Sequence, residues 1–418
     1  MYYGWLMLPV AMAVMIASSP GQTFCITYFN GPIAGALGLS QTSLATVYML
    51  ATLLAALPLP YFGAVADRVG LRRTTAVVAV CFGLACACMS QVSGIVSLLA
   101  AFLALRALGP GALVLLSNNT LAAWFHRRLG TVSGTNSFAM SLAMGGVPWV
   151  VLALIDAYGW RWAYVVLGAA VWVILLPLVW AVFRNRPDDV GQFIDGDHLA
   201  QAEASVATPD LSLPAGVEIR PVSLNDRGLS LAQAKRHRSF WILLLGTAVW
   251  TMVGTGIVFA LVPLFQARGM SEVHAATAFT LQTVAQGSMQ LGSGVLLRAV
   301  ATRYALAIAL GGIAASAALL AAGWAGAMIP AFVVYGAAQG LMTVIAGTAW
   351  AQYFGRVHLG KIRGASMMAA VGGSSLGPVL LGVSFDYGGG FAAGLWILAA
   401  AAAATAVAAP WATPPRVT

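Results

Sequence analysis

Charged residues are scarce in this sequence of 418 residues: Asp, Glu, Lys and Arg together make up 8% of it. Soluble domains usually carry about 25%. Hydrophobic residues make up 60% of the chain, so it lacks the polar residues that a water-exposed surface needs. The net charge of +9 would suggest nucleic acid as a partner in a soluble protein. Here the basic residues lie between apolar runs, so we expect a lipid bilayer and no nucleic acid.

Motifs for metals, disulfides and nucleotides are also missing. The four cysteines lie in apolar runs without the spacing of a metal site or a disulfide framework. No phosphate-binding loop of the form G-x-x-x-x-G-K-S/T occurs, which argues against transport driven by ATP. We therefore expect no metal and no cofactor. No Lys or Arg precedes Arg68, so the N-terminus does not resemble a cleaved signal peptide.

Acidic residues are absent from the centre of every apolar run, and all five histidines lie in or beside predicted loops. A buried proton relay normally needs a carboxylate or a histidine at depth. The sequence therefore argues against proton coupling through a central acid. Facilitated diffusion, exchange and coupling through the substrate's own proton stay open. A membrane enzyme is not expected, because no cluster of His, Asp and Glu lies inside the apolar runs.

Twelve apolar runs approach the ~20 residues that a membrane helix needs. They predict an all-α membrane protein with twelve transmembrane helices in two six-helix halves, residues 1–184 and 239–418. The polar segment 185–238 between them is expected to be a cytoplasmic linker, in which 229–238 forms either a short surface helix or a disordered tether. The runs are 5–28, 42–62, 74–92, 94–122, 131–154, 162–183, 239–263, 273–297, 304–323, 327–353, 364–384 and 391–410.

Basic residues predict the orientation in the membrane. Of the 21 Lys and Arg residues, all but Arg106, Arg161 and Arg268 fall in segments on the side of the N-terminus. Cytoplasmic loops carry such an excess. We therefore expect both termini in the cytoplasm, in a multi-pass protein of the cell membrane that is a monomer.

The segment 63–73, GAVADRVGLRR, is a charged island between two apolar runs. Its pattern resembles the loop between helices 2 and 3 of the major facilitator superfamily. The resemblance implies a transporter that works by alternating access, in which this loop is a conformational latch and binds no substrate. The matching positions are Gly63, Asp67, Arg68, Gly70 and Arg73.

The two halves repeat each other. Residues 124–130, WFHRRLG, recur as 353–360, YFGRVHLG, and the DAYG of 156–159 recurs as the DYG of 386–388. Two parallel six-helix repeats place a substrate site at the middle of the membrane, between the halves.

Other fragments, 28–32, 119–134 and 239–241, resemble the monocarboxylate and oxalate/formate branch of that superfamily. The branch implies a small organic solute, here a monocarboxylate-like anion, moved by secondary active or facilitative transport. The basic residues of the oxalate/formate pattern fall on Gln290 and Ala370, so oxalate is not expected. One alternative is import or export of a larger aromatic, vitamin-like or drug-like compound, which the 13 tryptophans would suit. An alternative of another class is a membrane sensor or assembly protein that does not transport.

Arg106 is the basic residue deepest in a predicted span, and it opens the sequence RALGPG, similar to the R-x-x-G-x-G motif of the family's fourth helix. An ionisable residue inside the membrane suggests function. Its planar guanidinium suits a carboxylate, so Arg106 could bind an anionic group or help to move a proton. Alternatively, it donates to backbone carbonyls where Gly109 and Pro110 disturb the helix.

Polar side chains in the spans complete the set of candidate substrate-binding residues. Gln282, Gln286 and Gln290 follow one another at intervals of four, so they share one helical face, which points either to a cavity or to another helix. Tyr335 occupies the position of the second repeat that corresponds to Arg106 and could complete a carboxylate clamp with it. The other candidates are Gln22, Thr27, Tyr28, Asn119, Trp250 and Gln339.

Overall fold

The computed structural model of the chain describes residues 2–126, 128–196, 229–355 and 359–415. Within these ranges every regular element is a helix and none is a strand. The prediction of an all-α protein is thus confirmed. The central part of the expected linker, 197–228, lies outside the described residues, as do Arg127 and Arg356 of the repeated segments.

The first half of the chain forms helices up to residue 181. Where a break interrupts a crossing, the two parts carry separate labels. The elements are α1 (Gly4–Ala17), η1 (Ser19–Gly21), α2 (Thr23–Leu37), α3 (Gln41–Ala56), α4 (Leu59–Val69), α5 (Leu71–Met89), α6 (Ile95–Arg106), η2 (Ala107–Leu113), α7 (Val114–Trp124) and α8 (Leu129–Ala181).

The second half follows the same plan. Its elements are α10 (Leu231–Ala234), α11 (Arg238–Phe259), α12 (Leu261–Gln266), α13 (Glu272–Ala299), α14 (Thr302–Ala321), α15 (Met328–Phe354), α16 (Leu359–Gly388) and α17 (Ala392–Ala408). The short helix α10 lies within 229–238, as one of the two alternatives for that segment anticipates. It is held to the bundle by Leu229, whose N–H donates to the Phe354 carbonyl at 2.9 Å.

Length and composition make most of these helices suitable for a membrane. In the part of the chain that the structure describes, nine stretches are long and apolar enough to cross a bilayer. One of them, α8, holds two crossings because Gly159 breaks it with a φ of 76°. With α3–α4 and α13 added, the described helices are consistent with the twelve expected crossings.

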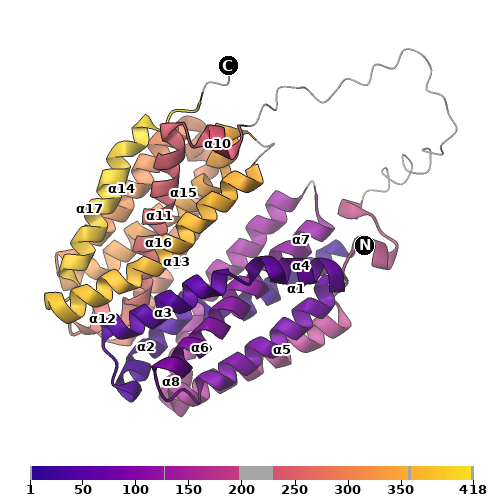
Figure 1. The fold of residues 1–418 in the computed structure, drawn as a ribbon, viewed down its shortest axis with the longest axis horizontal. Coiled ribbons are helices and arrows are strands. Elements are labelled where there is room, and N and C mark those ends of the chain that lie inside the picture. The colour runs from indigo at the N-terminus through magenta and orange to yellow at the C-terminus, as the bar shows by residue number, and fades with distance from the viewer. Residues whose placement is uncertain (1, 127, 197–228, 356–358, 416–418) are drawn as a thin grey trace.

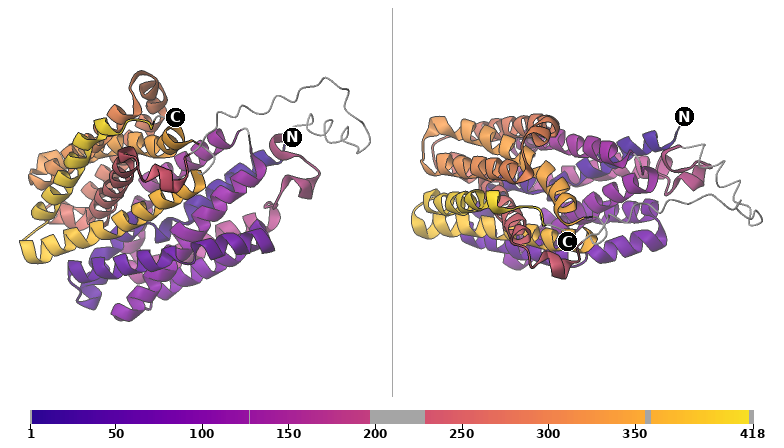
Figure 2. Two further views of the ribbon diagram at one scale, coloured as in Figure 1. Left: turned by 45° about the horizontal axis from the view of Figure 1, so that its top comes forward. Right: turned by 90° about the horizontal axis from the view of Figure 1, so that it is seen from above.

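The helices gather in two bundles, one built from α1–α8 and the other from α11–α17 (Figures 1 and 2). The bundles touch where α2 meets α11 and α12, where α3 meets α16, and where α8 meets α13. We name the face where α1 begins and α17 ends the terminal face, and the other the opposite face. The boundaries 1–184, 185–238 and 239–418 stay a prediction.

Contacts between the bundles concentrate toward the opposite face. There the Thr42 N–H, at the start of α3, donates to Asp386 Oδ2, near the end of α16, at 2.7 Å. Gly382 lets these two helices approach, because a Cβ added to it would lie 2.9 Å from the Gln41 carbonyl oxygen. At Phe259, the end of α11, the carbonyl accepts from Thr27 Oγ1 at 3.1 Å and from Asn30 Nδ2 at 2.9 Å, both on α2. The bundles are thus fastened together on one side of the molecule.

Candidate solute cavity between the two bundles

A break in the first crossing opens the site. Pro20 and Gly21 form a 3-10 turn between α1 and α2, and Gln22 is extended with φ −80° and ψ 148°. Gly21 is required because a Cβ there would lie 2.4 Å from the Leu105 carbonyl oxygen. The break leaves Gln22 and Thr23 half-buried at the middle of the crossing, where their side chains line a cavity.

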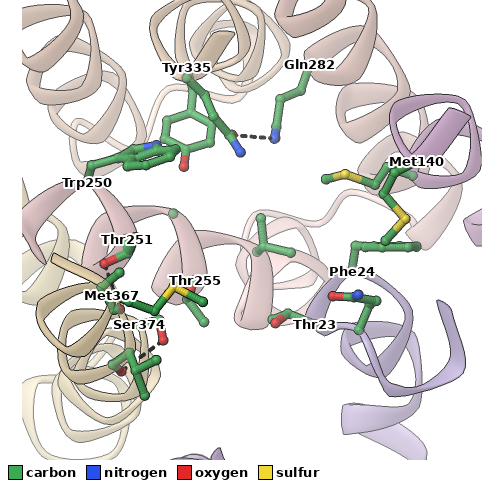
Figure 3. Close-up of a pocket in the computed structure, with 17 residues that line it drawn as sticks. Thr23, Phe24, Met140, Trp250, Thr251, Thr255, Gln282, Tyr335, Met367 and Ser374 are labelled. Carbon is green, nitrogen blue, oxygen red and sulfur yellow. Dashed lines mark hydrogen bonds between the residues drawn. The ribbon is translucent and has the colours of Figure 1, made fainter. Parts of the chain in front are cut away.

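The cavity has a volume of about 310 Å³ and lies between the bundles (Figure 3). This is near the lower end of the range for ligand pockets, about 300–1,000 Å³, so it suits a small solute. Helices of both bundles contribute to it. The lining residues are Gln22, Thr23 and Phe24 of the α2 segment, Met140 and Met144 of α8, Trp250, Thr251, Gly254, Thr255 and Val258 of α11, Gln282 of α13, Tyr335 and Gln339 of α15, and Met367, Ala370, Val371 and Ser374 of α16.

Amides and a phenol form the polar side of the cavity. Gln282 Nε2 donates to Gln339 Oε1 at 3.3 Å, across from α13 to α15. Gln282 Oε1 is buried and has no hydrogen-bond partner among the residues that the structure describes. The Tyr335 hydroxyl packs against Gly254, where an added Cβ would lie 2.2 Å from the hydroxyl oxygen. These groups can both donate and accept hydrogen bonds.

The remaining surface consists of aromatic, aliphatic and thioether groups together with the hydroxyls of threonines and a serine. Trp250 lies beside Tyr335, while Phe24 and Met140 face them across the cavity (Figure 3). Thr251 is satisfied by the structure itself, since its Oγ1 donates to the Ala370 carbonyl at 2.9 Å. Among the residues that the structure describes, no charged side chain lines this cavity.

Arg106 lies behind the cavity and does not line it. Its Nη1 donates to the Gly21 carbonyl at 3.3 Å, and its guanidinium lies 5.2 Å from the centre of the Tyr48 ring. Tyr48 in turn shares a hydrogen bond of 2.6 Å with Thr23 Oγ1, which faces the cavity. The π-helical turn η2, which contains Pro110, directly follows Arg106. Arg106 therefore joins the helix breaks of the first and fourth crossings, and its Nε is buried without a partner in the described part of the chain.

The three glutamines of α13 lie at three different levels. Gln282 lines the central cavity. Gln286 is buried where α13 packs against Gly340 of α15, and its Oε1 has no partner within the described ranges. Gln290 lines a second cavity of about 630 Å³, which α8, α13 and α15 form nearer the terminal face.

The structure thus brings together five of the eleven candidate residues that the sequence suggested: Gln22, Trp250, Gln282, Tyr335 and Gln339. Thr27 fastens α2 to α11, and Tyr28 is buried, with no described residue as a hydrogen-bond partner of its hydroxyl. Asn119 is half-buried on α7, outside the cavity lining. Arg106 and Tyr335 do not form one lining surface, so a clamp between them is not formed in this conformation.

Several lining residues were missed. Gly254, Thr255 and Val258 lie three, four and seven residues after Thr251 along α11, which places them with it on one helical face. That pattern, with Trp250 at its edge, is a signal that the sequence carries. The methionines of α8 and α16 have no comparable signal, because apolar residues surround the whole helix.

The predicted latch loop connects α4 to α5. Gly70 ends α4 with a φ of 95°, and a Cβ on it would lie 3.0 Å from Asn185 Oδ1. Arg72, which is not one of the five pattern positions, connects this loop to the end of α8 and to Asn185. Its backbone N–H donates to Asn185 Oδ1 at 2.8 Å. Its side chain donates through Nε to the Val179 carbonyl at 3.1 Å and through Nη2 to the Trp180 carbonyl. The Asp67 side chain lies outside what the structure describes. The role of the loop as a latch stays a prediction.

Comparison with known proteins agrees with this architecture. The sequence matches the Major Facilitator Superfamily over residues 10–276, and it has no match among curated proteins. The fold is similar to that of a bacterial homolog of the human lysosomal transporter Spinster in an inward-facing, unoccupied conformation, with 16% identity, a TM-score of 0.68, and coverage of 98% of this chain and 95% of the other. It is also similar to the nucleoside transporter NupG, with 14% identity and a TM-score of 0.69, and the match covers 96% of this chain and 98% of the other. The chain belongs to the major facilitator superfamily and is a multi-pass membrane transporter, not an enzyme.

Proposed function

We propose that this transporter moves a small uncharged organic solute through the cavity between its bundles. The observation that carries the proposal is the lining of the cavity, which offers amides, hydroxyls and aromatic rings, but no charged side chain among the described residues. An anion in such a site would lose its hydration without gaining a counter-charge, which is costly. A neutral solute loses less, and hydrogen bonds from the amides replace its water contacts.

Contacts between the bundles indicate the state of the transport cycle. They fasten the opposite face through Asp386, Thr42 and the Phe259 carbonyl, whereas a second cavity separates α8 from α13 and α15 nearer the terminal face. With both termini in the cytoplasm of a monomer in the cell membrane, this conformation is inward-facing. Rocking of the bundles about the central cavity would then open the opposite face.

A monocarboxylate, the anion that the branch resemblance implies, is the second candidate. The observation that favours it is the position of Arg106 one residue layer behind the cavity, where its Nε is buried and has no partner among the described residues. In the described part of the chain, its side chain contacts a carbonyl and a tyrosine ring, and neither neutralises its charge. A carboxylate that entered between Thr23 and Tyr48 would do so. This candidate requires that their hydrogen bond opens.

Uptake into proteoliposomes separates the candidates. The labelled panel is lactate, pyruvate, formate, glucose, uracil and riboflavin, offered with and without a pH gradient to wild type and Arg106→Gln. The proposal expects saturable uptake of an uncharged compound, and Arg106→Gln retains part of it. Uptake of a monocarboxylate alone, abolished by Arg106→Gln, would establish the second candidate instead. A protein that binds a compound and moves none would be a sensor of transporter shape.

A further inference from the structure

We infer that the cavity recognises a flat cyclic amide, that is, a ring that carries an N–H next to a C=O, as in a lactam or a pyrimidine base. The inference rests on the proposed function and names the substrate class for the same site. Its two structural elements are the amide pair Gln282–Gln339 and the indole of Trp250, all of which line the cavity.

The amide pair leaves one donor and one acceptor for a ligand. Gln282 Nε2 donates to Gln339 Oε1, so the Gln282 carbonyl oxygen and the Gln339 amino group remain. If both amides are turned over, the hydrogen bond reverses, and a Gln282 amino group and a Gln339 carbonyl remain. A complementary N–H and C=O are therefore offered in either orientation.

A group at this pair also lacks a partner. Gln282 is fully buried, and its Oε1 accepts no hydrogen bond from any residue that the structure describes. A buried acceptor without a partner is energetically unfavourable. A ligand N–H reaches this oxygen when the Gln282 side chain, which has no exposed surface in this conformation, turns toward the cavity, and the neighbouring ligand C=O then accepts from the half-buried Gln339 amide.

The ring that carries the amide is held by aromatic contact. Trp250 is half-buried and lines the cavity next to Tyr335 (Figure 3). In proteins that bind single-stranded nucleic acid, aromatic side chains such as an indole hold flat bases by stacking. Met140 and Met144 lie on the other bundle, and their flexible thioethers adapt to the far side of such a ring. The volume of about 310 Å³ accommodates one or two rings and excludes a long chain.

Electric charge distinguishes this class from other ring compounds. A cyclic amide is uncharged near neutral pH, in agreement with a lining without charged side chains among the described residues. An aromatic carboxylate would stack equally well on Trp250, but it has no N–H for the Gln282 oxygen and would find no counter-charge among the described lining residues. The pair therefore selects against acids and in favour of neutral amides.

The test uses two compounds of one shape, uracil and 1,3-dimethyluracil, because methylation removes both N–H donors and keeps the ring and its charge. Binding is measured by calorimetry on the purified full-length protein in detergent, and transport by counterflow in proteoliposomes. The variants are Gln282→Met and Gln339→Met. Gln352→Met is the matched control, since Gln352 lies on the same helix as Gln339 but accepts from Thr302 at the exposed end.

We expect wild type and Gln352→Met to bind uracil, and to bind 1,3-dimethyluracil at least tenfold more weakly. Gln282→Met and Gln339→Met should each bind uracil at least tenfold more weakly than wild type. A tenfold change in affinity is equivalent to about 1.4 kcal/mol. Equal affinity for the two compounds, or uracil binding that is indifferent to both glutamines, would overturn the inference. Transport of other solutes without any binding of uracil would also overturn it, while the proposed function would stand. Binding of uracil that depends on the glutamines, without counterflow of any solute, would support the inference and refute the proposed function.

Discussion

Single glycines set the shape of the cavity. A Cβ at residue 254 would lie 2.2 Å from the Tyr335 hydroxyl oxygen, a distance that forces the phenol away from α11. We predict that Gly254→Ala pushes the ring into the cavity and lowers solute affinity roughly tenfold, about 1.4 kcal/mol, without loss of the fold. Calorimetry and gel filtration check both parts. Gly311→Ala is the control, because nothing lies within 4 Å of an added Cβ there; an equal effect of the two variants would contradict the account.

For single residues, the sequence predicted which side chains avoid lipid better than it predicted where those side chains lie. Gln282, Tyr335 and Trp250 were candidates for a cavity lining because polar or amphipathic groups in a membrane helix avoid lipid, and in the structure all three line the cavity. Arg106 stood out for the same reason but lies one layer away. Its direction depends on the 3-10 turn at Gly21 and on the π-turn that contains Pro110. Such irregular turns break the helical periodicity on which the expectation relied.

Backbone carbonyls near the end of α8 connect this helix to the start of α5. The Arg72 side chain donates to the Val179 and Trp180 carbonyls near the end of α8, where carbonyls lack partners inside the helix. We predict that Arg72→Ala destabilises the protein by about 1–2 kcal/mol, measured as a lower melting temperature in detergent. Arg73→Ala is expected to cost less, since no such donation from Arg73 is present in the described structure. The reverse order would contradict this view of the loop.

The crossings themselves were well predicted, because an apolar run of sufficient length has few alternatives in a bilayer. In the structure, the first crossing extends to Leu37 and the eighth begins at Glu272. The seams between the bundles were not predicted. Asn30 donates to the Phe259 carbonyl, a backbone group that carries no signal in the sequence. Contacts between residues more than 200 positions apart depend on the packing of whole bundles.

The two bundles form a molecule that is closed on one face. The exposed Asp386 carboxylate accepts from the Thr42 N–H at the start of α3, where the helix dipole also favours a negative charge. We predict that Asp386→Ala weakens this closure by about 0.5–1 kcal/mol, a roughly twofold to fivefold shift toward opening of the opposite face. Spin labels at Val96 and Trp396, one on each bundle near this face, should show longer distances.

Asp188→Ala is the matched control for this prediction, because Asp188 is an exposed aspartate near the terminal face. Its distance distribution should equal that of wild type. Unchanged distances in Asp386→Ala would show that the contact between α3 and α16 does not hold the molecule in this state.

We propose that solute passes through the cavity between the bundles. This can be tested by blocking the cavity with a maleimide attached to the variant Thr255→Cys, because residue 255 lines the cavity on α11. The four native cysteines are replaced by alanine in this variant. Thr405→Cys on α17, outside the cavity, is the control. If solute passes through this cavity, modification of the cysteine at position 255 abolishes counterflow, and the transported solute slows the modification. The modified control keeps its activity. Full counterflow by completely modified Thr255→Cys protein would contradict the proposal.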